Sequence, residues 1–156
     1  MATVLQGGLI VGILDGFDVL LFFGARGVEA ARIFQYIASS LLGQAAFSSG
    51  GWSVGLGVVI HFAVACALTA IYVATTNMVP SLRDRWMASG IAYGLISYAG
   101  MNYIALPLTR VPPGAVPSWP VLANGVLAHV FLVGLPIALI VWRKCRRQNV
   151  GDNRES

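Results

Sequence analysis

Long apolar runs, separated by short polar or small-residue segments, dominate the pattern of this chain. The four longest runs cover Leu5–Phe23, Trp52–Val73, Trp86–Leu106 and Val121–Trp142. Each is close to or above the roughly 18 to 20 residues that a helix needs to cross about 30 Å of hydrocarbon. We therefore predict an all-α polytopic membrane protein, in which four transmembrane helices form a single bundle over residues 1–142.

The composition supports placing this chain in the lipid bilayer. Hydrophobic residues make up 57% of its 156 residues and charged residues only 10%, and the mean hydropathy is +0.76. A water-soluble domain needs more polar surface than this composition provides. The bilayer is therefore the expected partner of most of the surface of the bundle.

The placement of basic residues predicts an orientation. They gather after the last run and between the second and third runs, at Arg143, Lys144, Arg146, Arg147, Arg83 and Arg85. Because basic residues favour the cytoplasmic side, both termini are predicted to be cytoplasmic. Residues 143–156 are expected to form a disordered cytoplasmic tail. Attraction to anionic lipid accounts for its charge, so we expect no nucleic-acid partner.

The first run contains two carboxylates near its centre. Asp15 and Asp18 lie three residues apart, next to a line of glycines at Gly8, Gly12 and Gly16. Glycines four residues apart let another helix approach closely, and acids beside such a face point inward. Unpaired acids at this depth cost several kcal/mol, so the two carboxylates are candidate functional groups.

Residues Ala25–Gly51 predict a different kind of helix, because this segment is too long for a turn and too apolar for a solvated loop. Polar residues at Glu29, Arg32, Tyr36 and Ser39 form a stripe at helical spacing. Such a helix either lies in the membrane interface or enters the membrane as a re-entrant segment. Arg32 has two candidate partners, Asp18 across the bundle or Glu29 within its own helix.

The other three runs each carry a polar residue at a similar depth. His61 lies in the second run, Asn102 in the third and His129 in the fourth. At a rise of about 1.5 Å per residue, these side chains reach the same layer as Asp18, with Asp15 slightly deeper. We therefore predict one polar site at mid-membrane. Gly90 and Gly94 of the third run predict a second close helix contact.

Three chemistries fit this layer. His61, His129 and Asp18 are candidate ligands for a divalent metal. Alternating acids and histidines also suit a proton relay or a proton-coupled carrier. Two axial histidines would instead hold haem in a b-type electron-transfer protein.

In a fourth hypothesis the polar layer has only a structural role. The layer is then a hydrogen-bonded network in a structural or accessory subunit of a larger complex. No nucleophile elbow, phosphate-binding loop or metalloprotease motif is present, so we expect no enzyme and assign no catalytic residue. The proline-rich segment Pro107–Pro120 is expected to be extended and without helix.

Several segments resemble a known group of proteins. They are DGFDVLLFFGARGVEAARIFQYIASSLLGQAAF, HFAVACALTAIY, YGLISYAGMNYIALPLTRVP and LAHVFLVGLPIAL. Together they resemble a group of uncharacterised four-helix bacterial inner-membrane proteins, more distantly similar to the YagU-like proteins. The resemblance implies the bacterial cytoplasmic membrane and transfers no activity. Because four short spans seldom enclose a path alone, we also expect a homo-oligomer or a larger complex, docked through the glycine faces.

Overall fold

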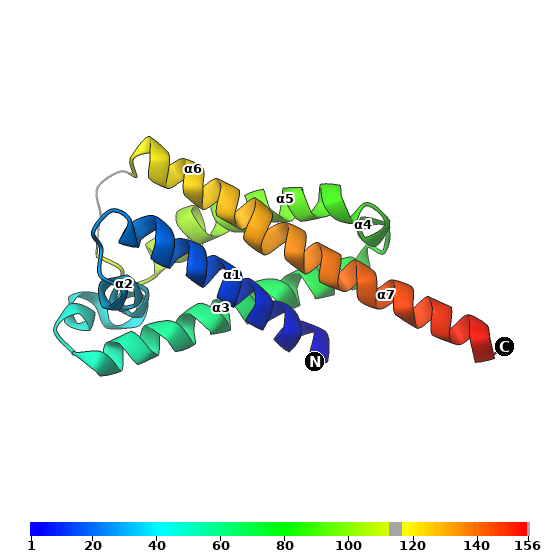
Figure 1. Cartoon of the computed structure of the whole chain (residues 1–156), viewed down its shortest axis with the longest axis horizontal. Coiled ribbons are helices and arrows are strands. Elements are labelled where there is room, and N and C mark those ends of the chain that lie inside the picture. The colour runs from blue at the N-terminus through cyan, green and yellow to red at the C-terminus, as the bar shows by residue number, and fades with distance from the viewer. Residues whose placement is uncertain (113–116, 156) are drawn as a thin grey trace.

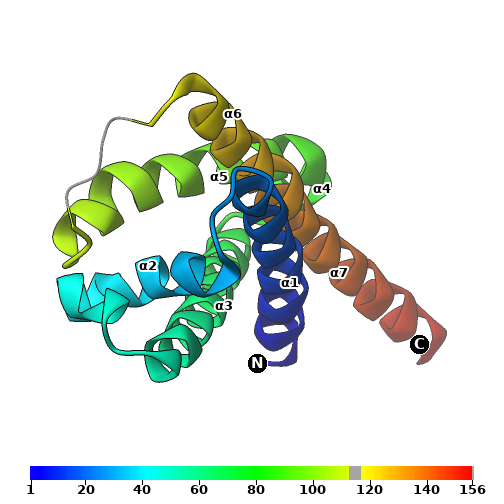
Figure 2. The ribbon, with the colours of Figure 1, turned by 60° about the vertical axis from the view of Figure 1, so that its left-hand side comes forward.

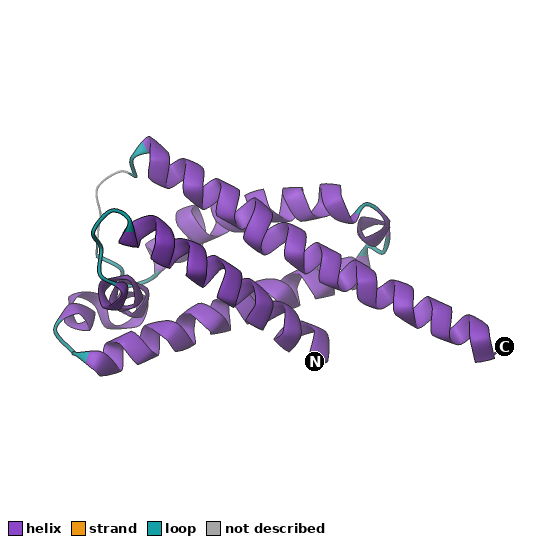
Figure 3. Cartoon of the chain, viewed as in Figure 1, coloured by secondary structure: helices purple, strands orange, loops and turns teal. Residues whose placement is uncertain are grey.

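The computed structural model describes residues 1–112 and 117–155, and the described chain is helical with no strand (Figures 1 and 3). Its elements are α1 (Ala2–Gly24), α2 (Ala30–Leu42), the 3₁₀ turn η1 (Gly43–Phe47), α3 (Gly51–Met78), α4 (Ser81–Asp84), α5 (Trp86–Ala99), the π-helix η2 (Gly100–Ala105), the 3₁₀ turn η3 (Leu106–Leu108), α6 (Trp119–Ala128), the π-helix η4 (His129–Gly134) and α7 (Leu135–Glu155).

Four helical stretches are long and apolar enough to cross a membrane, which confirms the predicted fold class. They run over Ala2–Gly24, Gly51–Met78, Trp86–Leu108 and Trp119–Arg146. At about 1.5 Å per residue, even the shorter ones exceed the roughly 30 Å of a bilayer core. Large apolar side chains of α1, such as Leu9, Ile13 and Phe17, lie on the outside of the bundle, where lipid would solvate them.

The chain passes back and forth along the bundle, so its connections alternate between two ends. The N-terminus, α4 and the end of α7 lie at one end, and α2 lies at the other (Figure 1). Arg83, Arg143 and Lys144 are therefore at the same end as Met1. The Lys144 ammonium donates a hydrogen bond to the Thr3 hydroxyl, which ties α7 to the start of α1.

Helix α2 lies across one end of the bundle instead of running along it (Figures 1 and 2). It packs on α3, where Gly57 leaves room for the backbone carbonyl of Phe34. Ile33 and Ala38 are buried, while Arg32 and Tyr36 are exposed. Ser39 is fully buried and its hydroxyl donates to the Tyr36 carbonyl at 2.6 Å, so it is not exposed as Arg32 and Tyr36 are.

The predicted glycine contacts between α1 and α3 are present. A Cβ added to Gly12 would lie 2.6 Å from the Phe62 ring, and one added to Gly8 would lie 2.8 Å from the Cα of Cys66. At Gly16 the neighbour is the imidazole of His61, 3.1 Å from the position of such a Cβ. Small residues on α1 therefore bring its backbone against α3.

The glycines of α5 contact the fourth span in the same way. An added Cβ on Gly94 would lie 2.5 Å from the carbonyl oxygen of His129, and one on Gly90 would lie 3.1 Å from that of Gly134. Both glycine faces are thus filled from within the chain. This corrects the expectation that they form docking surfaces for another subunit, because the contacts that favour close approach are already made.

The third and fourth spans each contain a π-helical segment, η2 and η4. Such wide turns are rare and occur often at functional sites. Segment η4 ends just before Pro136, whose ring nitrogen cannot donate to the helical ladder. Both π-helical segments contain a residue of the predicted polar layer. His129 is the first residue of η4, and Asn102 lies in η2.

The segment Pro107–Pro120 is less extended than predicted. Helix continues through η3 to Leu108, and α6 begins at Trp119 with Pro120 in its first turn, where the missing N–H costs nothing. The Arg110 N–H donates to the Ser40 carbonyl at 3.0 Å, which ties this segment to α2. Residues 113–116 of the segment lie outside the described residues.

The last helix continues beyond the apolar sequence. Helix α7 runs to Glu155, past residue 143, where the cytoplasmic tail is predicted to begin. Arg146 lies over the ring of Trp142, with its guanidinium carbon 5.1 Å from the ring centroid. This contact lies within the last turn of the spanning stretch.

Candidate functional site

The two carboxylates of α1 face the interior of the bundle, as the sequence predicts. Asp15 lines a partly open cavity in the bundle. Asp18, one turn further along α1, accepts a 2.8 Å hydrogen bond on Oδ2 from the side-chain amide of Asn124 on α6. The two acids therefore have different surroundings, because only Asp18 has a protein donor among the described residues.

His61 reaches from α3 to α1 through the space that Gly16 leaves. Its Nε2 lies 2.8 Å from the carbonyl oxygen of Gly12. Because a carbonyl only accepts, Nε2 carries the proton and donates it. In the neutral ring, Nδ1 is then the nitrogen with a free lone pair, and none of the described residues hydrogen-bonds to it.

His129 is held by its own helix. Its Nδ1 lies 3.0 Å from the carbonyl oxygen of Gly125, so Nδ1 donates and Nε2 keeps a lone pair. The Tyr98 ring packs edge-on against the imidazole, with 5.3 Å between centroids. The ring orientation of each histidine is thus fixed by one backbone hydrogen bond, and each ring keeps one nitrogen for another partner.

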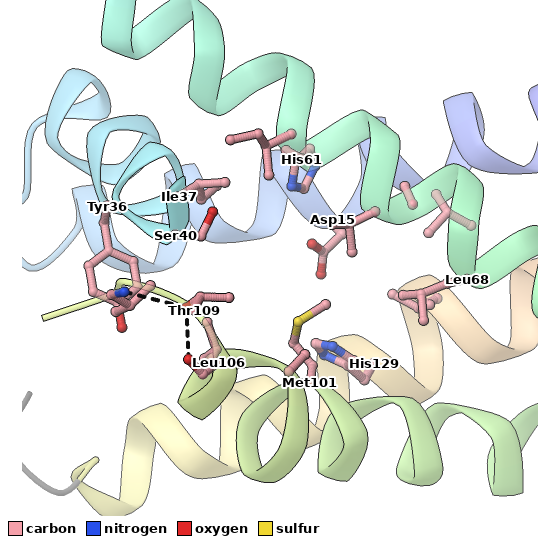
Figure 4. A pocket seen from close by; sticks show the side chains of 17 residues that line it. Asp15, Tyr36, Ile37, Ser40, His61, Leu68, Met101, Leu106, Thr109 and His129 are labelled. Atoms are coloured by element: carbon pink, nitrogen blue, oxygen red, sulfur yellow. Dashed lines mark hydrogen bonds between the residues drawn. The ribbon is translucent and has the colours of Figure 1, made fainter. Parts of the chain in front are cut away.

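A cavity of about 310 Å³ brings Asp15, His61 and His129 together. In Figure 4 the Asp15 carboxylate lies between the two imidazoles, and it is close enough to both rings to interact electrostatically with each. The polar side chains of Tyr36 and Ser40 line the cavity from α2.

Most of the remaining cavity wall is apolar. Its residues include Val11, Ile60, Val64, Leu68, Met101 and Val133, from α1, α3 and the π-helical segments. An apolar wall keeps the local dielectric low, which strengthens electrostatic interactions of any charged group inside. The three ionisable groups therefore face one another in surroundings where a change of charge on one affects the others.

Asn102 and Arg32 do not join this site, which corrects two assignments. The Asn102 amide donates to the Tyr98 carbonyl in its own helix at 3.0 Å and does not line the cavity. Arg32 lies over the Phe47 ring, with its guanidinium carbon 4.4 Å from the centroid. Since Asp18 pairs with Asn124, the Asp18–Arg32 alternative is wrong.

The metal and haem hypotheses find little geometric support. Among the described residues, no group of three or more His, Cys, Asp or Glu side chains is placed to hold one metal ion. A porphyrin between His61 and His129 would have to share the cavity with the Asp15 carboxylate.

Sequence reasoning missed Asn124 as a partner of Asp18, and it did not identify which residues of α2 line the cavity. An amide in the first turn of an apolar span was an available signal, because buried amides need partners. Nothing in the pattern indicated that Tyr36 and Ser40 would line the cavity. Their positions depend on how α2 lies across the bundle.

The hydrogen bonds of the two imidazoles predict opposite tautomers. At a pH where both rings are neutral, we expect the proton of His61 on Nε2 and that of His129 on Nδ1. Nitrogen chemical shifts in ¹⁵N-histidine-labelled protein distinguish protonated from unprotonated ring nitrogens. Single His61→Gln and His129→Gln variants assign the signals, and identical tautomers at the two positions would contradict the geometry described above.

The sequence matches no protein-family profile, no curated protein and no solved structure. What this chain does must therefore be inferred from the four-span bundle and from the cavity that its helices enclose.

Proposed function

We propose that this chain is a multi-pass membrane protein that takes up and releases protons at Asp15, His61 and His129, as the working site of a proton-coupled carrier. The observation that supports this most directly is the shared cavity, where a carboxylate meets two imidazoles that each have an uncommitted nitrogen. Carboxylates and histidines are the groups that relay protons inside membranes.

The hydrogen bonds assign a role to each group. The Asp15 carboxylate, His61 Nδ1 and His129 Nε2 are free to accept a proton, while His61 Nε2 and His129 Nδ1 hold the rings in place. Protonation of Asp15 removes a charge from a low-dielectric site, so the net charge of the site changes each time Asp15 gains or loses a proton. Asp18 stays paired with Asn124 and acts as a nearby fixed group.

The proposal keeps the predicted location in the bacterial inner membrane, with both termini cytoplasmic. The basic residues at one end of the bundle support that orientation through the positive-inside tendency. A homo-oligomer or a place in a larger membrane complex also remains part of the proposal.

The direct test is a pH-dependent infrared difference spectrum of the protein in lipid. We expect a band from a protonated carboxyl that responds to pH, and Asp15→Asn should remove it. Asp84→Asn, the same change at an exposed carboxylate in α4, is the matched control and should leave the band in place. A carboxyl spectrum that is unchanged by Asp15→Asn would instead favour a structural or accessory role for the polar layer.

A further inference from the structure

The cavity is larger than a proton or a bare metal ion requires. Its volume of about 310 Å³ lies at the lower end of the roughly 300 to 1,000 Å³ that small-molecule sites occupy. Bulk water occupies about 30 Å³ per molecule, and cavities with apolar walls tend to stay dry. A space of this size and lining therefore suits an organic molecule with an apolar body.

The three ionisable groups of the cavity are acceptors, while the hydroxyls of Tyr36 and Ser40 can donate or accept. The Asp15 carboxylate and the free nitrogens of His61 and His129 all offer lone pairs when the rings are neutral. A primary ammonium has three N–H donors and can donate charge-assisted hydrogen bonds to the Asp15 carboxylate, while the two imidazoles line the same cavity. Its positive charge would also neutralise the carboxylate in a place where an unpaired charge is costly.

The same groups disfavour other occupants. No lysine or arginine lines the described cavity, so an anionic ligand would meet Asp15 without a compensating charge. A single metal ion is disfavoured because the described residues form no cluster of three ligands. A neutral alcohol of the same shape could fill the apolar part but would leave the carboxylate without a counter-charge.

We propose that the cavity binds a small primary ammonium with an apolar body, such as an arylalkylammonium ion. The ammonium group pairs with the Asp15 carboxylate, and the apolar body lies along Val64 and Leu68 of α3, which line the same cavity. This inference rests on the proposed function, because the ammonium and the proton use the same carboxylate. A protonated Asp15 must release its proton when it pairs with the ammonium.

Calorimetric titration of the whole chain in lipid nanodiscs tests this inference, with empty nanodiscs subtracted to remove partitioning into lipid. The probes are phenethylammonium and its neutral analogue, phenethyl alcohol. We expect the ammonium to bind at least about ten-fold more tightly than the alcohol, because only the ammonium forms charge-assisted hydrogen bonds. Equal affinity for the two probes, or no binding of phenethylammonium, would overturn the inference.

Two variants locate the binding site. Asp15→Asn keeps the shape of the side chain and should weaken phenethylammonium binding at least about ten-fold, while Asp84→Asn should leave it unchanged. Val64→Trp keeps Asp15 but fills the cavity, so it should abolish binding while the thermal unfolding profile shows a folded bundle. Undiminished binding in a folded Val64→Trp variant would place the ligand elsewhere.

The outcome is separable from that of the proposed function. The infrared titration of Asp15 is measured without any amine, so proton exchange can be established even if phenethylammonium fails to bind. Conversely, binding that depends on Asp15 without a pH-dependent carboxyl band would support the ammonium site and contradict proton exchange.

Discussion

Replacing Gly134 with alanine is expected to push α5 away from the fourth span. The free energy of unfolding should fall by about 1 to 3 kcal/mol, the usual cost of overpacking. The added Cβ would meet the carbonyl oxygen of Gly90 and would lie 2.7 Å from the nitrogen and 2.9 Å from the Cα of Gly94. These neighbours are backbone atoms of a helix, so they cannot rotate away as a flexible side chain can.

The measurement is the free energy of unfolding in lipid or mixed micelles for the wild type and the variant. Gly55→Ala is the matched control, because it makes the same change in an apolar helix where an added Cβ meets no atom within 4 Å. A Gly134→Ala protein as stable as Gly55→Ala would mean that α5 and η4 are not in the close contact described.

The second large effect is expected at the pair between Asp18 and Asn124. Asn124→Leu removes the amide that donates to the Asp18 carboxylate and leaves that carboxylate without its partner inside the bundle. Hydrogen bonds to charged groups contribute about 1.5 to 3 kcal/mol, so we expect a loss of stability in that range. This exceeds the roughly 0.6 kcal/mol average for hydrogen bonds between transmembrane helices.

A double-mutant cycle with Asp18→Leu isolates the interaction. We expect the double variant to lose much less stability than the two single variants together, because the second substitution removes a group that is already unpaired. Asn102→Leu serves as the control, since its amide bonds to a carbonyl of its own helix and should show no coupling with Asp18. Additive losses for Asp18 and Asn124 would contradict the observed pair.

The two acids of α1 divide structural and chemical roles between them. Asp18 has a partner and links α1 to α6, which makes it a fixed polar contact between the first and fourth spans. Asp15 faces the cavity and the two imidazoles, which makes it the group that is free to react. The hypothesis of a structural polar network therefore describes Asp18 well, while the proposed proton and ammonium chemistry concerns Asp15.

The histidines show how a small set of glycines supports the site. Gly12 supplies the carbonyl that orients His61, and Gly16 leaves the space that the ring occupies. On the other side, Gly94 brings α5 against the backbone at His129. Close helix packing and the placement of the imidazoles are thus two results of the same small residues.

Local sequence pattern is enough to predict the spans of this protein and the direction in which its acids point. Apolar runs of sufficient length predict the four spans, because an unsatisfied backbone is costly in hydrocarbon and helices satisfy it internally. Glycines four residues apart predict the face that α1 presents to another helix. Acids beside that face, Asp15 and Asp18, are predicted to point inward, and the structure agrees.

Which polar groups meet depends on how the helices pack against one another. Asn102 and His129 look equivalent in sequence, yet the amide of Asn102 folds back on its own helix while His129 lines the cavity. Arg32 lies over Phe47 and leaves Asp18 to Asn124. Helical spacing fixes the face and depth of a residue, but the rotation and crossing of each helix depend on contacts between residues far apart in sequence.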